Sequence, residues 1–365
     1  MASISVLVVD DSVVIRRLVT NILDEDPDIQ VVGTAPNGRI ALSKIPQVAP
    51  DLVTLDIEMP VLDGLATLRE LRALYPKLPV IMFSTLTERA ASATLEALSL
   101  GANDYVTKPA NVGSVQAGMD SIRSQMVPKI KALCASLLPR QPRTASTFTP
   151  SVRIPTPADG ARVPSGPPQV LAIGASTGGP DALAEVLTRL PADFPVPIVV
   201  VQHMPPVFTT LFAGRLDSKS ALSISEASDG DVLRPGTVLI APGDHHMVLR
   251  RSGDVVRVVL NQGTPENWCR PAVDPLFRSV AEAYGGRTLA VVLTGMGQDG
   301  LRGCDRLRAV GAHVIVQDEA SSVVWGMPGA VAGAGLAHRI LPLAQIPSAI
   351  LAATAGARTS LAGLR

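Results

Sequence analysis

The chain of 365 residues has few aromatic side chains and few cysteines. Aromatic residues make up only 3% of the sequence, so its cores should be aliphatic, as the hydrophobic fraction of 47% allows. The three cysteines, Cys134, Cys269 and Cys304, are odd in number and far apart. This spacing fits neither a disulfide framework nor a metal site, and it predicts a reducing, cytoplasmic environment.

The sequence also lacks net charge and long apolar runs. Its 32 lysines and arginines balance 32 aspartates and glutamates, so we expect no bulk attraction to nucleic acid or anionic lipid. No uninterrupted apolar segment reaches the length of a membrane span, and the N-terminus lacks the basic region of a signal peptide. We therefore expect a cytoplasmic protein that binds no nucleic acid and does not insert into the membrane.

The pattern of the chain changes twice along its length. Over residues 1–135, short β-branched runs alternate with amphipathic segments, which predicts five strands and a doubly wound parallel sheet. Residues 136–168 are rich in Pro, Ser, Thr and Arg and predict a flexible linker, with a docking segment as the less favoured alternative. Strand and helix signals resume over 169–365, where residues 237–260 predict a hairpin or meander. The fold class is therefore α/β, with two doubly wound three-layer domains, the second having a parallel sheet plus a β-hairpin.

Carboxylates follow two predicted strands of the first domain. Asp10 and Asp11 come after SVLVV, and Asp56 comes after LVTL. Because ligands gather beyond the carboxyl ends of parallel strands, these groups should converge and require a cation such as Mg²⁺. Ser84 and Lys108 follow the fourth and fifth predicted strands. A metal, a hydroxyl and an ammonium beside a carboxylate form a phosphoryl-binding site.

This arrangement resembles the response-regulator receiver domain over the first third of the chain, through VVDDS, LDIEMP, MFST and VTKP. The resemblance implies a flavodoxin-like fold in which Asp56 takes a phosphoryl group from a phosphohistidine of a sensor kinase. It also implies that Asp11, Asp56 and the backbone carbonyl of Glu58 bind Mg²⁺.

Other positions of the receiver pattern have matching residues. By the same resemblance, Lys108 would neutralise the aspartyl phosphate and Asp10 would complete the acidic pair. Ser84 would hydrogen-bond the phosphate, and we favour it over Thr85 because the predicted strand ends there. Tyr105 occupies the position of the aromatic switch residue.

A second candidate site begins at GASTGGP, residues 174–180, which matches G-x-S-x-G between a strand and a helix. The pattern places Ser176 on a sharp turn where helix amides favour negative charge. A glycine-rich turn before a helix could instead cradle a phosphate. This one lacks both the P-loop lysine and the dinucleotide-binding glycine pattern.

A nucleophilic serine needs a base and an orienting carboxylate. Among the five histidines, His203 directly follows the strand PIVVVQ, at the same predicted sheet edge as Ser176. Asp299 lies in LTGMGQDG, after the strand TLAVVL. His245 and His246 fall in a turn, where local hydrogen bonding is favoured over a role in a site. The chain order Ser, His, Asp differs from that of α/β-hydrolases.

From residue 169 nearly to the C-terminus, the sequence is similar to the catalytic domain of the CheB family of chemotaxis protein-glutamate methylesterases. The similarity is carried by GASTGGP, VVQHMP, IAPGDHHM, CRPAVDPLF and LTGMGQDG. It implies that Ser176 is the nucleophile, His203 the general base and acid, and Asp299 the orienting group. It also implies an oxyanion site at the backbone of Met296, with Thr177 beside the nucleophile, and no cofactor in the hydrolase.

Together the two resemblances imply a phosphorylation-activated hydrolase of glutamate methyl esters on chemoreceptors that also deamidates receptor glutamines. Its partners would be methylated chemoreceptors and a chemotaxis histidine kinase, and we expect a monomer. Two alternatives remain, an esterase acting on another protein or a small-molecule ester and a catalytically silent binding module. The neutral charge and the lack of a helix-turn-helix disfavour a DNA-binding regulator. We also expect the unphosphorylated receiver to cover the Ser176 cleft.

Overall fold

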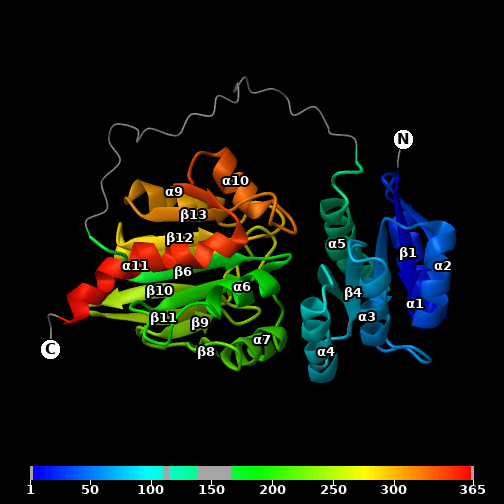
Figure 1. Cartoon of the computed structure of the whole chain (residues 1–365), viewed down its shortest axis with the longest axis horizontal. Helices are drawn as coiled ribbons and strands as arrows, with labels where there is room; N and C mark the ends of the chain where they lie inside the picture. The colour runs from blue at the N-terminus through cyan, green and yellow to red at the C-terminus, as the bar shows by residue number, and fades with distance from the viewer. Residues whose placement is uncertain (1–2, 110–114, 139–165, 363–365) are drawn as a thin grey trace, which may run out of the picture. The chain divides into compact units, whose positions relative to one another are not determined.

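The computed structural model describes residues 3–109, 115–138 and 166–362. The chain divides into two compact units, Met1–Ser151 and Val152–Arg365. Most of the expected linker, 136–168, lies outside the described residues. Each unit contains its own sheet and its own hydrophobic core (Figure 1).

The first unit is built on a five-stranded parallel sheet in the order β2-β1-β3-β4-β5. This order is the flavodoxin-like one that the sequence predicts. The order in which the strands are added to the sheet reverses between β1, which precedes Asp10, and β3, which ends at Asp56. The strands are β1 (Ile4–Val9), β2 (Ile29–Ala35), β3 (Leu52–Asp56), β4 (Val80–Ser84) and β5 (Asp104–Thr107).

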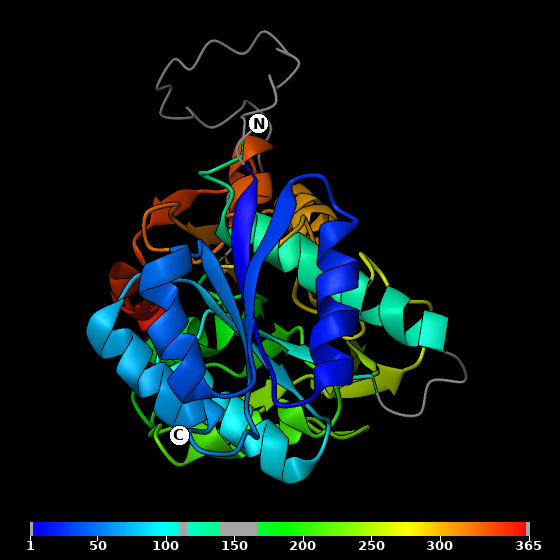
Figure 2. The ribbon, with the colours of Figure 1, turned by 90° about the vertical axis from the view of Figure 1, so that its right-hand side faces the viewer.

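Helices cover both faces of this sheet. Figure 2 shows α1 and α5 on one face and α2, α3 and α4 on the other, in agreement with the contacts between the helices. Four of the five begin at a side-chain cap that accepts a backbone N–H three residues further on. The helices are α1 (Val13–Asp24), α2 (Gly38–Val48), α3 (Gly64–Leu74), α4 (Glu88–Ser99) and α5 (Val115–Leu133).

The second unit has a seven-stranded parallel sheet in the order β14-β13-β12-β6-β7-β9-β8. The predicted hairpin is present as β10 and β11, whereas Thr237–Ile240 at the start of the same passage is β9 of the main sheet. The strands are β6 (Val170–Ala175), β7 (Ile198–Gln202), β8 (Ser223–Glu226), β9 (Thr237–Ile240), β10 (His246–Ser252), β11 (Val255–Asn261), β12 (Thr288–Val292), β13 (His313–Gln317) and β14 (Arg339–Leu341).

The core of this unit is aliphatic, as the composition predicts. Residues of the hairpin, α8, α9 and the central strands share one buried cluster, while α6 contacts α7 and α11. The helices are α6 (Gly179–Leu187), α7 (Phe208–Asp217), α8 (Val273–Tyr284), α9 (Leu301–Ala309), α10 (Met327–Gly333), the short 3₁₀ helix η1 (Leu343–Gln345) and α11 (Ile346–Ala362). In the part of the chain that the structure describes, no helix combines the length and apolar character required to cross a membrane.

Candidate functional sites

Ser176 and His203 occupy equivalent positions on two neighbouring strands. Each is the first residue after its strand, β6 and β7. The parallel register pairs Ala175 with Gln202, so the two residues that follow are level at the same edge of the sheet. The Gln202 side chain donates to the Ser176 carbonyl at 3.0 Å, and the His203 amide donates to the Ala175 carbonyl at 3.2 Å. Their backbones are therefore held side by side.

Glycines shape the turn that carries Ser176. Gly178 adopts φ 75° immediately before α6, a conformation that residues with a Cβ rarely adopt. Gly295, after β12, lies against the serine, since a Cβ there would come within 2.9 Å of Ser176 Cβ and 2.4 Å of Met327 Sδ. Gly295, the residue before Met296, therefore packs directly against the candidate nucleophile.

The two residues predicted for the oxyanion site differ in their surroundings. Thr177 is buried, and its carbonyl accepts a hydrogen bond from Thr294 Oγ1 at 2.9 Å. Met296 is partly exposed. Among the described residues, no acceptor takes a hydrogen bond from the Met296 amide.

Asp299 is only 2% exposed and accepts hydrogen bonds on both carboxylate oxygens. Two come from Val273 and Asp274, the first amides of α8, whose N-terminus favours an anion. Burial raises the pKa of Asp299, but its hydrogen bonds and the charge of His203 lower it, and the net direction is downward. Asp299 is therefore an ionised partner. Its donors are His203 Nε2 at 2.8 Å, Val273 N at 2.6 Å, Asp274 N at 3.0 Å, Gly300 N at 2.9 Å and Asn267 Nδ2 at 2.8 Å.

The imidazole of His203 has a partner at each nitrogen. Nε2 lies 2.8 Å from Asp299 Oδ2, and Nδ1 lies 3.4 Å from Cys269 Sγ. Burial by itself lowers the pKa of His203, but Cys269 and Asp299 raise it, to about 10. In the described residues, no hydrogen bond joins Ser176 Oγ to His203. The structure thus brings Ser176, His203 and Asp299 to one edge, with Cys269 at the imidazole nitrogen that Asp299 does not bind.

Sequence reasoning missed two residues of this site, Asn267 and Cys269. Both lie in the segment before α8, and their contacts with Asp299 and His203 join residues 32 and 66 positions apart. The cysteine count alone could not reveal this contact. The available signal was the CRPAVDPLF motif, which begins at Cys269 itself and leads directly into the helix that binds Asp299.

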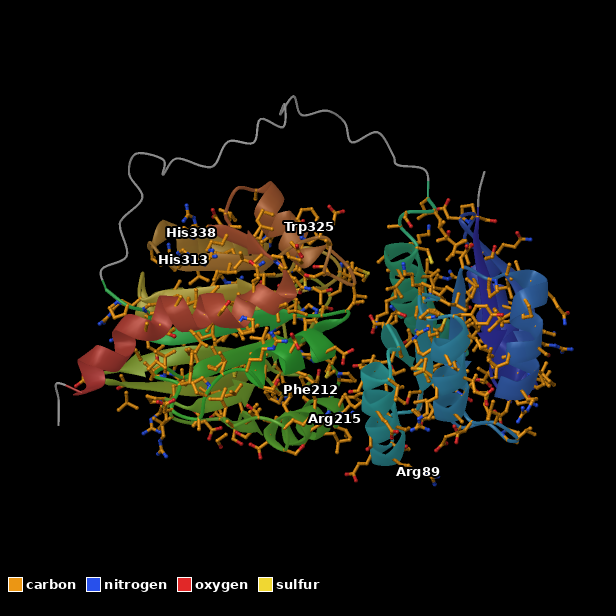
Figure 3. The ribbon with its side chains drawn as sticks, viewed as in Figure 1. Arg89, Phe212, Arg215, His313, Trp325 and His338 are labelled. Atoms are coloured by element: carbon orange, nitrogen blue, oxygen red, sulfur yellow. The ribbon has the colours of Figure 1, made fainter. Side chains whose placement is uncertain are left out.

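The other histidines have local partners. His245 Nδ1 lies 3.2 Å from the Gly243 carbonyl. The buried His246 binds the Thr264 carbonyl through Nε2 at 3.1 Å and accepts the Ala272 amide at Nδ1 at 3.3 Å. His313 and His338 stack with ring centroids 4.2 Å apart where β13 and β14 begin (Figure 3). That is the opposite edge of the sheet from Ser176.

A cavity of about 490 Å³ opens between β10 and α8. None of its lining residues is Ser176, His203 or Asp299. It therefore provides no pocket for a small ester at the candidate nucleophile.

The acidic residues of the first unit also converge. Asp10, Asp11 and Asp56 each place a carboxylate oxygen within 4.8 Å of the others, and Lys108 Nζ lies 2.8 Å from both Asp10 Oδ2 and Asp56 Oδ2. Burial raises the pKa of Asp56 to about 6, although Lys108 opposes the shift. Three carboxylates this close together provide the oxygen ligands that Mg²⁺ prefers.

The remaining receiver residues lie around this cluster. Ser84 ends β4 and is buried, with its hydroxyl oxygen 2.8 Å from Thr94 Oγ1 of α4, a partner that the sequence did not reveal. Tyr105 is buried, with Lys129 Nζ 5.1 Å from its ring centroid. The Glu58 side chain is exposed, 4.0 Å from Arg89 Nε.

Comparisons with known proteins match both units. The family model "CheB methylesterase" matches residues 171–350, and the model "Response regulator receiver domain" matches residues 6–119. The two matched ranges do not overlap, and one falls in each unit.

Relatives match nearly the whole chain. A protein-glutamate methylesterase/protein-glutamine glutaminase of Trichodesmium erythraeum is 53% identical over 96% of this chain and 99% of the relative. One of Nocardioides sp. is 54% identical over 99% of this chain and 98% of the relative. Among solved structures, the CheB methylesterase catalytic domain of Thermotoga maritima is 45% identical, with a TM-score of 0.50, over 50% of this chain and 97% of that domain.

Proposed function

The chain belongs to the CheB methylesterase family, and we propose that it hydrolyses glutamate methyl esters through Ser176, His203 and Asp299. It is a receiver-controlled protein-glutamate methylesterase and protein-glutamine glutaminase of chemotaxis. The observation that carries the catalytic assignment is the level placement of Ser176 and His203 on β6 and β7, with Asp299 hydrogen-bonded to the imidazole.

The chemistry is acyl transfer. Ser176 Oγ attacks the ester carbonyl while its proton passes to Nδ1 of His203, because Nε2 is held by Asp299. The proton then moves to the departing methoxide, and methanol leaves. Water repeats the sequence on the acyl-serine and restores the free carboxylate. A glutamine side chain follows the same route, with ammonia as the leaving group.

Two features stabilise the charges that develop. The amide of Met296 donates to the oxyanion, beside Thr177 and the N-terminus of α6. The ionised Asp299 stabilises the imidazolium that forms on His203. No cofactor takes part in these steps.

The substrate is a protein side chain. The curated relatives are named for protein-bound glutamate and glutamine. Methylated chemoreceptors therefore fit the site better than a small soluble ester does. A catalytically silent binding role is disfavoured because Ser176, His203 and Asp299 are all present at one edge.

The receiver supplies the control. We assign Asp56 as the phosphorylated residue, with a chemotaxis histidine kinase as donor and Lys108 as the counter-charge. Asp11, Asp56 and the Glu58 carbonyl would hold Mg²⁺, which would neutralise charge on the phosphoryl group. Asp10 completes the acidic cluster, Ser84 hydrogen-bonds the phosphate, and Tyr105 is the aromatic switch residue.

The organisation that follows has three parts. Residues 1–135 form the receiver, 136–168 the linker and 169–365 the methylesterase domain, and the protein acts as a monomer.

Methanol release from membranes that contain methylated receptors tests this function. Wild-type protein should release methanol, and a small phosphodonor with Mg²⁺ should accelerate it. Asp56→Asn should keep the basal rate and ignore the phosphodonor, whereas Asp120→Asn, an exposed acid of the same unit, should respond like wild type. A wild-type rate that no phosphodonor changes would count against control by the receiver.

A further inference from the structure

Trp268 is fully exposed, with a relative exposure of 100%, although it is the largest kind of apolar side chain. Among the described residues nothing covers it. The chain has only two tryptophans, and the other, Trp325, is half-buried and donates its indole N–H to the Gln317 carbonyl at 3.0 Å (Figure 3). Exposed tryptophans often mark protein interaction sites, because they combine a large apolar area with few rotatable bonds.

Both chain neighbours of Trp268 contact the catalytic residues. The side chain of Asn267 donates to Asp299 Oδ1 at 2.8 Å, and Cys269 Sγ lies 3.4 Å from His203 Nδ1. Trp268 therefore lies at the rim of the catalytic site. A protein surface that brings its side chain to Ser176 comes within reach of this indole.

The loop that carries Trp268 is fixed in place. His246 binds the Thr264 carbonyl before it and the Ala272 amide after it. Within the loop, the backbones of Glu266 and Cys269 exchange two hydrogen bonds, of 3.1 and 2.9 Å. A rigid loop loses little entropy when a partner binds, so the exposed indole is preorganised.

The backbone is strained where the side chain turns outward. Asn267 and Trp268 have φ values of 50° and 63°, in the left-handed region. Asparagine tolerates this region, but a bulky residue such as tryptophan rarely adopts it. Strain of this kind concentrates at functional sites. Here it lets Asn267 and Cys269 reach the catalytic residues while Trp268 points to solvent.

A second exposed apolar side chain lies beside the nucleophile. Val323 is 40% exposed, and its Cγ2 would be 2.5 Å from a Cβ placed on Gly178, two residues after Ser176. The site therefore has one exposed apolar contact beside its base and another beside its nucleophile. An apolar surface around the modified glutamate fits this rim.

We propose that Trp268 is a substrate-binding residue that packs against the receptor surface beside the methylated glutamate. This inference rests on the proposed function, because it takes the substrate to be a protein side chain. The contact would lower the KM for the receptor without taking part in the chemical step, since the indole makes no contact with Ser176, His203 or Asp299.

The test compares two substrates in the full-length protein with phosphodonor present. Methanol release from methylated receptor membranes reports the protein substrate, and hydrolysis of p-nitrophenyl acetate reports the catalytic residues alone. Trp268→Ala should raise the receptor KM at least about tenfold, as loss of an interface anchor does, with small-ester hydrolysis within about twofold of wild type. Trp268→Phe should restore most of the affinity. Val255 has the same 40% exposure as Val323 but lies on the β10–β11 hairpin. The control variant Val255→Ala should therefore change the kinetics with neither substrate.

Three results would overturn the inference. An unchanged receptor KM in Trp268→Ala would show that the indole does not touch the substrate. An equal loss with both substrates would show that it shapes the catalytic residues instead. A faster small-ester reaction in unphosphorylated Trp268→Ala, with the receptor KM unchanged, would show that it binds the receiver. Failure of the proposed function gives a different result, in which wild-type protein cleaves the small ester but releases no methanol from receptors, and that result also removes the proposed partner.

Discussion

Cys269 Sγ lies 3.4 Å from His203 Nδ1, the nitrogen that accepts the proton of Ser176 in the proposed mechanism. The thiol and the serine hydroxyl therefore compete for one atom of the base. Because Cys269 and Asp299 outweigh burial, the pKa of His203 is raised to about 10. The resting site thus favours the imidazolium, which cannot act as a base.

This contact predicts how activity depends on pH. A base works in its neutral form, so a raised pKa means that kcat/KM should increase as the pH rises toward that value. Cys269→Ala removes one of the groups that raise the pKa of His203. The midpoint of the profile should then move to lower pH. Cys134→Ala, a buried cysteine of the other unit, should leave the midpoint unchanged. If both variants keep the wild-type midpoint, Cys269 does not influence the base.

Asp299→Asn should remove most of the activity. The amide cannot stabilise the imidazolium, and its NH₂ group would face the amides of Val273 and Asp274. Loss of the orienting carboxylate in a serine triad lowers kcat by roughly 10⁴-fold. Single-turnover methanol release measures the effect, with Asp305→Asn, an exposed acid on α9, as the control. A loss of activity smaller than about tenfold would show that Asp299 has only a structural role.

Gly295→Ala should displace the nucleophile. The new Cβ would meet Ser176 Cβ at 2.9 Å and Met327 Sδ at 2.4 Å, so the serine or the loop must shift. A misplacement of about 1 Å can cost on the order of 10²-fold in rate. Gly214→Ala on α7, where an added Cβ meets nothing within 4 Å, should keep full activity and stabilise the helix by about 0.5–1 kcal/mol. Equal activities of the two variants would contradict the close packing described at Ser176.

A fragment that begins near Gln169 should be more active than the unphosphorylated whole chain. The expectation is that the unphosphorylated receiver covers the Ser176 cleft, and one phosphoryl group makes only a few new charge-assisted bonds, so the shift should be partial. We expect tens-fold stimulation at most, measured as methanol release per enzyme. A fragment no faster than the unphosphorylated chain would instead make the receiver an activating or targeting module.

Periodicity along the chain was enough to predict the two parallel sheets. The runs before Asp10, Asp56, Ser176 and His203 are buried and β-branched, and such runs place polar residues at the carboxyl edge. Short strands were harder to recognise. The four residues of β8 and the three of β14 are too few to show a period, and only their pairing in the sheet defines them.

The details of the site depend on contacts that sequence spacing does not encode. Ser176, His203 and Asp299 could be proposed as a site from the sequence because each follows a strand or lies in a motif. Cys269 looked like an isolated cysteine, because its approach to His203 depends on the loop before α8. The hydrogen bond between Thr94 and Ser84 could not be predicted for the same reason, because it forms only when α4 packs against β4.

Methanol release by Ser176→Ala tests the account most directly. The measurement uses full-length protein, methylated receptor membranes and a phosphodonor, with thermal unfolding to show that the fold is intact. Because the hydroxyl is the nucleophile, the rate should fall by roughly 10⁶-fold, as in serine hydrolases whose triad is removed. His203→Gln added to Ser176→Ala should lower it little further, because the residues act as a unit. A folded Ser176→Ala protein that releases methanol at the wild-type rate would contradict the assignment of the nucleophile and with it the mechanism.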